Sequence, residues 1–232
     1  VSTMGEMASN IAHEVNQPLT AIATYAQACQ RLVEGGMVEA AEMVEVLKRI
    51  GTEALRAGEI ITRLRGLVRR RDSEMVECDL GQLLNEISSL AFVDARLNDV
   101  ELKFLVPPQT PTILADGVQI QQVILNLIRN GIDAMEDVIP ALRTLDVRVT
   151  LPAEDRVQLS VSDRGCGIPQ ESESTLFQPF FTTKTAGLGL GLNISQSIIS
   201  KHGGKLWFSR NSEGGTTFSF SLPTVSETQN DR

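Results

Sequence analysis

The chain has 232 residues, of which 42% are hydrophobic and 22% charged, so its composition is that of a soluble globular protein with enough apolar residues for a core. Its formal net charge of -8 argues against the basic surface of a general nucleic-acid binder, and we expect no nucleic-acid partner. No apolar run approaches the roughly 18 residues of a membrane span, and three cysteines without a CxxC spacing indicate a reducing, cytoplasmic compartment.

Two long amphipathic helices are predicted at the start of the chain. Apolar residues recur at steps of three or four over residues 4–32 and again over residues 40–68, and Gly35-Gly36 separates the two stripes. Pro18 lies inside the first stripe, where its ring and its missing N–H should bend the helix. Because two helices alone cannot bury both stripes, we expect residues 1–74 to form a dimeric four-helix bundle. The alternative is a helical hairpin packed on its own globular domain.

Helix and strand patterns alternate from about residue 76 onward. Asp79 is placed to cap a helix that reaches Leu97, and Asp116 to cap an apolar helix that ends near Met135. Further elements are expected as strands over 101–106, 144–151, 156–163, 205–209 and 216–222, and as a glycine-started helix over 187–202. The predicted fold class is therefore α+β: the helical hairpin, then an α/β sandwich over residues 75–223, then a disordered polar tail over residues 224–232.

A histidine next to a carboxylate lies on the first predicted helix. The neutral imidazole of His13 is a competent nucleophile that can hold a phosphoryl group on one nitrogen. Glu14 can hydrogen-bond the other nitrogen and balance the positive charge that develops during attack. Asn16 and Gln17 follow His13 by three and four residues, which places them on the same helical face. These four residues form the candidate catalytic group; the alternative is an ordinary solvated histidine.

Polar residues interrupt the apolar helix that follows Asp116. Asn126 and Asn130 are one turn apart, and Asp133 lies one turn beyond Asn130. Side-chain amide oxygens are neutral, hard ligands that suit Mg²⁺ when phosphate oxygens and water complete its coordination. Asn126 and Asn130 are therefore the candidate metal ligands, with Asp133 beside them in a candidate nucleotide site. Asparagines in a helix can equally be capping or surface residues.

The loop Asp163-Arg-Gly165-Cys-Gly167 directly follows a predicted strand. The carboxylate of Asp163 can accept a hydrogen bond from an exocyclic amine such as that of adenine. Gly165 and Gly167 allow the backbone to approach a purine closely, because they carry no side chain. This loop is the candidate purine site.

Two further segments complete the candidate nucleotide site. The glycine-rich run 187–192 precedes a helix, where free N–H groups can bind polyphosphate. It does not sit in a βαβ unit, and no GxxxxGK[ST] motif occurs, so we expect neither a dinucleotide fold nor a P-loop. Residues 176–184 contain three phenylalanines and indicate either a lid over the nucleotide or an ordinary core-packing loop. The candidate contacts from these segments are Phe180, Phe181, Thr183, Lys184, Gly187, Leu188, Gly189, Gly191 and Leu192.

Taken in order, these segments resemble the H, N, G1, F and G2 boxes of the sensor histidine kinases of two-component systems, over about residues 2–223. The His-Glu-Val-Asn-Gln-Pro segment and the short Phe-Phe-Thr-Thr-Lys lid are most similar to those of oxygen-sensing and dicarboxylate-sensing kinases. The resemblance implies a dimerisation and histidine-phosphotransfer domain (1–74) and a catalytic ATP-binding domain of the GHKL type (75–223). It also implies ATP and Mg²⁺ as cofactors, a homodimer, and a response-regulator receiver domain as partner.

The resemblance also implies roles for single residues. His13 would be the phosphoacceptor and Glu14 its acid/base partner, and Asp163 would contact adenine. Related ATPases such as gyrase carry Glu where Asn126 stands; an amide cannot take a proton from water, so Asn126 disfavours hydrolysis. Kinases that also dephosphorylate their regulator often carry Thr or Asn where Gln17 stands, and this departure leaves phosphatase activity open.

The sequence therefore predicts an ATP-dependent protein histidine kinase that phosphorylates itself on His13 and passes the phosphoryl group to an aspartate of a response regulator. The alternatives are a GHKL-type ATPase and a nucleotide-binding dimeric scaffold without phosphotransfer. Because the chain begins at Val1 rather than Met, we expect it to be a fragment that lacks an upstream sensor or membrane segment.

Overall fold

The chain divides into two units, Val1–Arg71 and Asp72–Arg232. The structure is a computed structural model that describes residues 2–35, 42–54, 57, 75–153, 155–182 and 189–225, with the backbone alone for residues 2–15. Within these ranges, none of the helices combines the length and the hydropathy that crossing a membrane requires.

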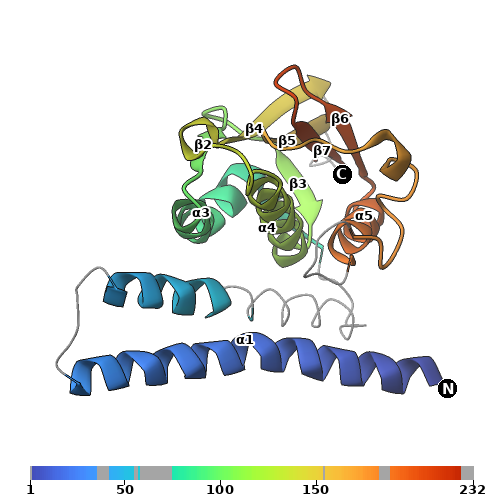
Figure 1. Ribbon diagram of the computed structural model, residues 1–232. Helices are drawn as coiled ribbons and strands as arrows, with labels where there is room; N and C mark the ends of the chain where they lie inside the picture. The colour runs from blue at the N-terminus through green and yellow to red at the C-terminus, as the bar shows by residue number, and fades with distance from the viewer. Residues whose placement is uncertain are drawn as a thin grey trace. The chain divides into compact units, whose positions relative to one another are not determined.

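The N-terminal unit is helical throughout its described part. Helix α1 (Ser2–Glu34) runs through Pro18 and ends at Gly35, whose N–H donates to the Arg31 carbonyl. Residues 42–54 form a second helical stretch, and the Arg49 guanidinium lies 6.0 Å from the centroid of the Tyr25 ring on α1. The two predicted helices are confirmed over these residues (Figure 1).

The C-terminal unit is an α/β sandwich, as predicted. Its main sheet has five strands in the order β2-β4-β5-β7-β6, and only the β2–β4 pair is parallel. The helices α3 (Leu80–Leu97), α4 (Gly117–Ala134) and α5 (Gly191–Lys201) cover one face of this sheet (Figure 1). The strands are β2 (Glu101–Leu105), β4 (Thr144–Ala153), β5 (Arg156–Ser162), β6 (Lys205–Arg210) and β7 (Thr216–Pro223).

Two further strands were absent from the sequence prediction. β1 (Val76–Asp79) and β3 (Thr112–Ala115) pair antiparallel in a small second sheet. Each has four residues, too few for an alternating pattern to stand out, and each leads directly into a helix.

Three predicted helix boundaries can be compared with the structure. Asp79 and Asp116 cap α3 and α4 as predicted, each accepting backbone N–H bonds with its carboxylate. The expected helix over 187–202 begins later, at Gly191. Gly189 has a φ of +63°, a left-handed conformation that cannot belong to a right-handed helix, so α5 begins only beyond it.

The core lies between the sheet and α4. Successive apolar residues of α4 are at most 1% exposed and belong to one cluster with the inward-facing residues of β4 and β5. Burying each of these side chains contributes about 1.5–3 kcal/mol. This packing determines which face of α4 turns away from the sheet. The buried residues are Ile120, Val123, Ile124, Leu127 and Ile128 on α4, with Leu145, Val147, Leu159 and Val161 on the strands.

A buried histidine ties the end of α5 to the start of α4. His202 is 4% exposed, its Nε2 accepts the Asp116 N–H at 3.0 Å, and its Nδ1 lies 2.7 Å from the Ile198 carbonyl oxygen. Because Nε2 accepts, Nδ1 carries the proton and donates to that carbonyl. His202 therefore has a structural role.

We expect His202→Ala to lower the free energy of unfolding by about 1–3 kcal/mol, because it leaves the buried Asp116 N–H without an acceptor. Urea denaturation followed by the fluorescence of Trp207, the single tryptophan of the chain, measures the change. Lys201→Ala, at the exposed neighbouring position, is the control and should leave the transition unchanged. Equal transitions for the two variants would contradict the structural role.

Candidate functional site

Asp163 is a buried carboxylate with one oxygen left open. It directly follows β5 and is 3% exposed. Its Oδ1 accepts the N–H groups of Gly165 at 2.8 Å and Thr216 at 3.1 Å, while its backbone carbonyl accepts the Asn211 Nδ2 at 2.7 Å. No donor in the described part of the chain bonds Oδ2. That oxygen can therefore accept a hydrogen bond from a ligand amine.

Burial shifts the ionisation of this carboxyl. Desolvation raises the pKa of Asp163, and the hydrogen bonds from Gly165 and Thr216 offset part of that rise because they stabilise the charged form. A donor from a ligand at Oδ2 would stabilise the carboxylate further.

The glycines after Asp163 are required by the protein's own backbone. A Cβ on Gly165 would collide with the backbone of Ala134 at the end of α4, where the Cys166 N–H donates to the Ala134 carbonyl. Gly167 has a φ of +70°, which a side chain disfavours. The approach of a purine to both residues stays a prediction; in the structure, Gly165 lies against the end of α4 and Gly167 against the carbonyl of Gly214.

Asn126 lies where α4 meets the start of α5. Its Nδ2 donates to the hydroxyl of Ser195 at 3.0 Å, and a Cβ on Gly191 would collide with its Oδ1. The residue before α5, Leu190, provides no side-chain cap, so the first N–H groups of α5 have no side-chain acceptor from it. The amide oxygen and the positive end of α5 thus lie together, an arrangement suited to a phosphate and its metal ion.

The other two candidate residues on α4, Asn130 and Asp133, are half-buried, and both already have partners within the protein. The Arg129 Nε lies 3.1 Å from the Asp133 Oδ1, and the Arg129 Nη1 also pairs with Asp94 on α3. Asn130 also makes contacts of its own. The nucleotide and metal roles of Asn130 and Asp133 remain predictions. A ligand would meet Asp133 as a carboxylate that is already paired with Arg129.

The predicted lid, residues 176–184, is described as far as Thr182, and the chain is described again from Gly189. Phe180 is 59% exposed with a φ of +65°, and a Cβ on Gly189 would collide with the backbone of Phe181. Leu192 on α5 packs against the core. The backbones of Phe181 and Gly189, on either side of residues 183–188, therefore lie in close contact. Thr183, Lys184, Gly187 and Leu188 lie outside the described residues.

The candidate catalytic group belongs to the N-terminal unit. His13 and Glu14 lie on α1, and their side chains are not among those the structure describes. Asn16 and Gln17 follow them on the same helix, and both are exposed. In the C-terminal unit, Asn126 lies beside Gly191, and Asp163 and Gly165 lie beside the end of α4, whereas the histidine group is on the other unit.

The donor set fits a nucleotide and a magnesium ion. The open Oδ2 of Asp163 suits an adenine amine, the start of α5 suits phosphate, and the amide oxygen of Asn126 suits Mg²⁺ shared with phosphate oxygens. In the described ranges, no group of three or more His, Cys, Asp and Glu side chains is placed to hold a metal.

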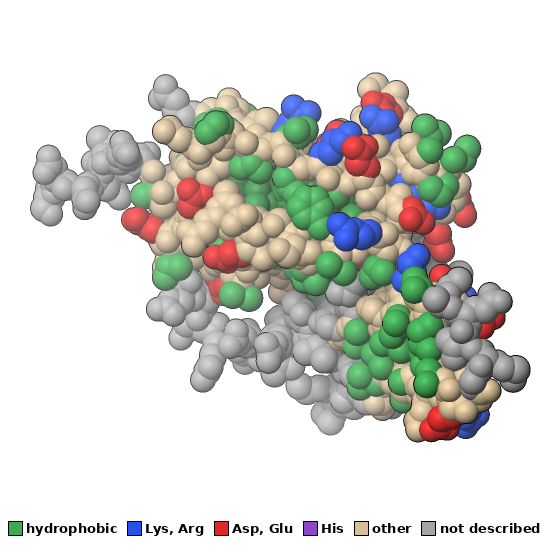
Figure 2. Space-filling model, turned by 90° about the vertical axis from the view of Figure 1, so that its left-hand side faces the viewer, with side chains coloured by type: hydrophobic (Ala, Val, Ile, Leu, Met, Phe, Trp, Pro, Cys, Tyr) green, Lys and Arg blue, Asp and Glu red, His purple; other side chains and the backbone are tan. Residues whose placement is uncertain are grey.

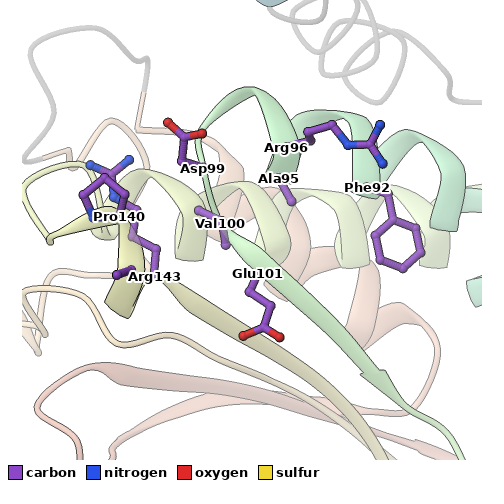
Figure 3. Close-up of a pocket in the computed structure, with 9 residues that line it drawn as sticks. Phe92, Ala95, Arg96, Asp99, Val100, Glu101, Pro140 and Arg143 are labelled. Atoms are coloured by element: carbon purple, nitrogen blue, oxygen red, sulfur yellow. The ribbon is translucent and has the colours of Figure 1, made fainter.

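A separate hollow lies between the end of α3, the start of β2 and the 3-10 turn η1 (Pro140–Leu142) (Figure 3). One of its residues, Arg143, donates to the carbonyls of Val138, Asn98 and Glu136 at 2.8 Å each, so its guanidinium holds loops together. None of the predicted nucleotide residues lines this hollow.

Sequence reasoning missed three residues that shape the site. Ser195 holds Asn126, while Thr216 and Asn211 hold Asp163. Asn211 also accepts the Glu213 and Gly215 N–H groups with its side chain, which orders the β6–β7 turn. The only signal in the sequence was a turn at 211–215, and it gave no indication that this turn contacts Asp163.

Two family models match the chain. The model described as "His Kinase A (phospho-acceptor) domain" matches residues 3–73, which contain His13. The model described as "Histidine kinase-, DNA gyrase B-, and HSP90-like ATPase" matches residues 115–226, which contain Asn126, Asp163 and Gly191. The second match implies use of ATP.

Curated relatives align with nearly the whole chain. The sensor protein FixL of Bradyrhizobium diazoefficiens is 46% identical over 228 residues, covering 98% of this chain and 45% of FixL. The C4-dicarboxylate transport sensor protein DctS of Rhodobacter capsulatus is 39% identical, covering 97% of this chain and 34% of DctS. The chain therefore spans less than half the length of these relatives.

Solved structures of the histidine kinase ThkA have a similar fold. Its nucleotide-free catalytic domain has a TM-score of 0.58 and 35% identity, covering 65% of this chain and 96% of that domain. ThkA in complex with the response regulator protein TrrA has a TM-score of 0.63 and 28% identity, covering 98% of this chain and 64% of ThkA.

We expect Asp163→Asn to gain stability relative to the wild type as the pH rises. The pKa of Asp163 is raised in the folded protein, so the favourable contribution of its neutral form is complete at low pH and is lost as the pH rises through the folded-state pKa. Asp163→Asn cannot ionise at this position, so it does not lose stability there as the pH rises. Urea denaturation at a series of pH values from about 3 upward measures the difference between the two proteins. A difference independent of pH, or one of opposite slope, would contradict the raised pKa.

We expect Gly191→Ala to weaken nucleotide binding by about tenfold or more, because the new Cβ would displace Asn126 or the start of α5. Calorimetric titration with a non-hydrolysable ATP analogue measures the change. Ser200→Ala, at an exposed position of the same helix, is the control. Unchanged affinity in Gly191→Ala would show that this contact is not part of the site.

Proposed function

The chain belongs to the sensor histidine kinases of two-component systems, and from that premise we propose that it is the ATP-dependent, autophosphorylating kinase core of a longer protein. The γ-phosphoryl group of ATP passes to His13 and then to an aspartate on a response-regulator receiver domain. The observation that carries the proposal is a buried carboxylate with an open oxygen, Asp163, in the same unit as an amide, Asn126, at a helix start.

The C-terminal unit, with proposed bounds 75–223, binds the nucleotide. Asp163 accepts the adenine amine, and the first N–H groups of α5 bind the phosphates. Asn126 and Asn130 would hold Mg²⁺ through their amide oxygens, and the bound ion would supply positive charge to neutralise the phosphates. Asp133 and the glycine loops complete the walls. Phe180, Phe181, Thr183 and Lys184 belong to the proposed lid, while Gly187, Leu188, Gly189 and Leu192 contact the nucleotide from the lid end and the start of α5.

The N-terminal unit, with proposed bounds 1–74, provides the acceptor. One ring nitrogen of His13 attacks the γ-phosphorus and forms an N–P bond as the bond to the bridging oxygen breaks and ADP leaves. The N–H of the other ring nitrogen donates a hydrogen bond to the Glu14 carboxylate, which fixes the tautomer and balances the positive charge that develops. Asn16 and Gln17 are exposed on the same helix and can contact the incoming phosphoryl group or the receiver domain. Positioning of the two reactants supplies most of the rate, as is usual in phosphoryl transfer.

Asn126 favours a kinase over an ATPase. A water molecule becomes a strong nucleophile only if a base removes its proton, and a neutral amide cannot act as that base. In this site the amide is further engaged with Ser195. The phosphoryl group is therefore preserved for His13.

The surface of the N-terminal unit supports the proposed homodimer. Apolar side chains gather on this unit (Figure 2), and the exposed ones include Leu19, Val33, Val44 and Leu47. A second copy would cover them in a four-helix bundle. We place the reaction in the cytoplasm, a location that agrees with the three free cysteines.

Two comparisons support the remaining partners. The similarity to ThkA in complex with a response regulator supports docking of a receiver domain on this chain. The chain spans less than half of FixL and of DctS, which supports an additional sensor segment in the full-length protein.

We expect incubation with γ-labelled ATP and Mg²⁺ to give an acid-labile, base-stable label on the wild type and none on His13→Gln. The variant keeps its nucleotide site, so calorimetry should show unchanged affinity for the ATP analogue. Gln27→Ala, at an exposed position of the same helix, is the control and should label normally. Asp163→Asn should lose both the label and at least about tenfold in affinity, because a charge-assisted hydrogen bond is removed.

Each rival function has its own outcome in this experiment. Steady phosphate release that His13→Gln does not change, with no label on the wild type, would identify an ATPase. Absence of nucleotide binding in the wild type would identify a scaffold. A label that persists in His13→Gln would refute His13 as the acceptor.

A further inference from the structure

We propose that Ser195 is a positioning residue that holds the side-chain amide of Asn126 against the phosphate-binding start of α5, where the positive helix end selects its carbonyl oxygen and not its NH₂ group. The proposal rests on the nucleotide site described under the proposed function. The orientation matters because the carbonyl oxygen of the amide can bind a metal ion, whereas its NH₂ group cannot.

The two ends of an Asn side chain have almost the same shape, so the neighbours must distinguish them. The Nδ2 of Asn126 donates to the Ser195 hydroxyl at 3.0 Å. A hydroxyl can accept from the NH₂ group or donate to the oxygen, so this bond fixes where the amide lies and leaves the choice of end to its other neighbour. On the other side, the backbone of Gly191 lies so close to Oδ1 that a Cβ there would collide with it. The amide is therefore held between one polar partner and the first residue of α5.

The start of α5 determines which end faces it. Gly191 opens the helix, Leu190 provides no side-chain cap, and the positive end of the helix dipole attracts a carbonyl oxygen and repels an NH₂ group. The same field would bind phosphate, so the amide oxygen is directed to the place where a metal ion would bridge it to phosphate oxygens.

The Ser195 hydroxyl holds the amide of Asn126 in this orientation. The residue is 2% exposed and lies on the buried face of α5 near Ile198 and Ile199. If the hydroxyl were removed, the NH₂ group of the half-buried Asn126 would lose this hydrogen-bond acceptor, which is unfavourable. The amide would then turn to reach water or the backbone, and its oxygen would leave the metal position for part of the time.

The first test needs neither nucleotide nor metal. In the ¹⁵N-labelled full chain, the side-chain NH₂ resonances of Asn126, assigned by their loss in Asn126→Ala, should be separate and should exchange slowly with water. Ser195→Ala should shift them and make their exchange faster. Ser195→Thr keeps a hydroxyl and should restore slow exchange. Ser197→Ala, at an exposed position of α5, should leave the signals unchanged. Identical Asn126 signals in the wild type and Ser195→Ala would refute the proposal.

The second test separates the metal from the purine. Calorimetry with the non-hydrolysable ATP analogue, with and without Mg²⁺, gives the factor by which Mg²⁺ tightens binding. We expect Ser195→Ala to reduce that factor about tenfold, the usual effect of losing a residue that orients a metal ligand. Affinity without Mg²⁺ should stay within about twofold of the wild type, because Asp163 is untouched.

A double-mutant comparison completes the design. In an Asn126→Ala background, Ser195→Ala should have no further effect on the Mg²⁺ factor, because the residue acts only through Asn126. An unchanged Mg²⁺ factor in Ser195→Ala would overturn the proposal, and so would an equal loss with and without metal, which indicates packing alone. If the wild type binds no nucleotide, the proposed function fails, and the amide resonances still decide whether Ser195 holds Asn126.

Discussion

Burial of the apolar face of α4 is the constraint on which the candidate site depends. Ile120, Ile124 and Leu127 are fully buried between the helix and the sheet, and each contributes about 1.5–3 kcal/mol. Turning the helix by one position would expose several such residues at once. The helix is thereby held in one rotation, and Asn126, Asn130 and Asp133 can only lie on the half-buried side, where Asn126 meets α5.

The two ends of the site have opposite electrostatic character. The carboxyl of Asp163 is buried, and desolvation raises its pKa. Its Oδ1 accepts two backbone N–H groups, and its Oδ2 has no donor in the described part of the chain. Asn126 is neutral, lies beside the positive end of a helix, and cannot remove a proton from water. In the proposed function, the first end binds a ring with an amine and the second binds phosphate with its metal. That division agrees with a site that holds nucleotide without hydrolysing it.

The glycines of the site have roles within the protein itself. A side chain on Gly165 would strike the end of α4, one on Gly189 would strike the backbone of Phe181, and one on Gly191 would strike Asn126. The sequence also predicts ligand contacts for these residues, and those contacts remain a prediction. Their positions coincide with the candidate site because loops that border a nucleotide must also pack closely on the helices behind it.

The sequence alone determined the local elements and the order of the motifs. Asp79 and Asp116 stand directly before apolar repeats, and a cap followed by a helical period needs only neighbouring residues, so α3 and α4 were predicted well. Short-range patterns failed for β1 and β3, which have only four residues each, and for the start of α5, which the left-handed Gly189 sets. The tertiary structure alone decided how Ser195 meets Asn126, 69 residues away, and how Asn211 meets Asp163, 48 residues away. Hydrogen bonds between residues so distant in sequence depend on how whole helices and strands pack, and no local pattern of side chains records them.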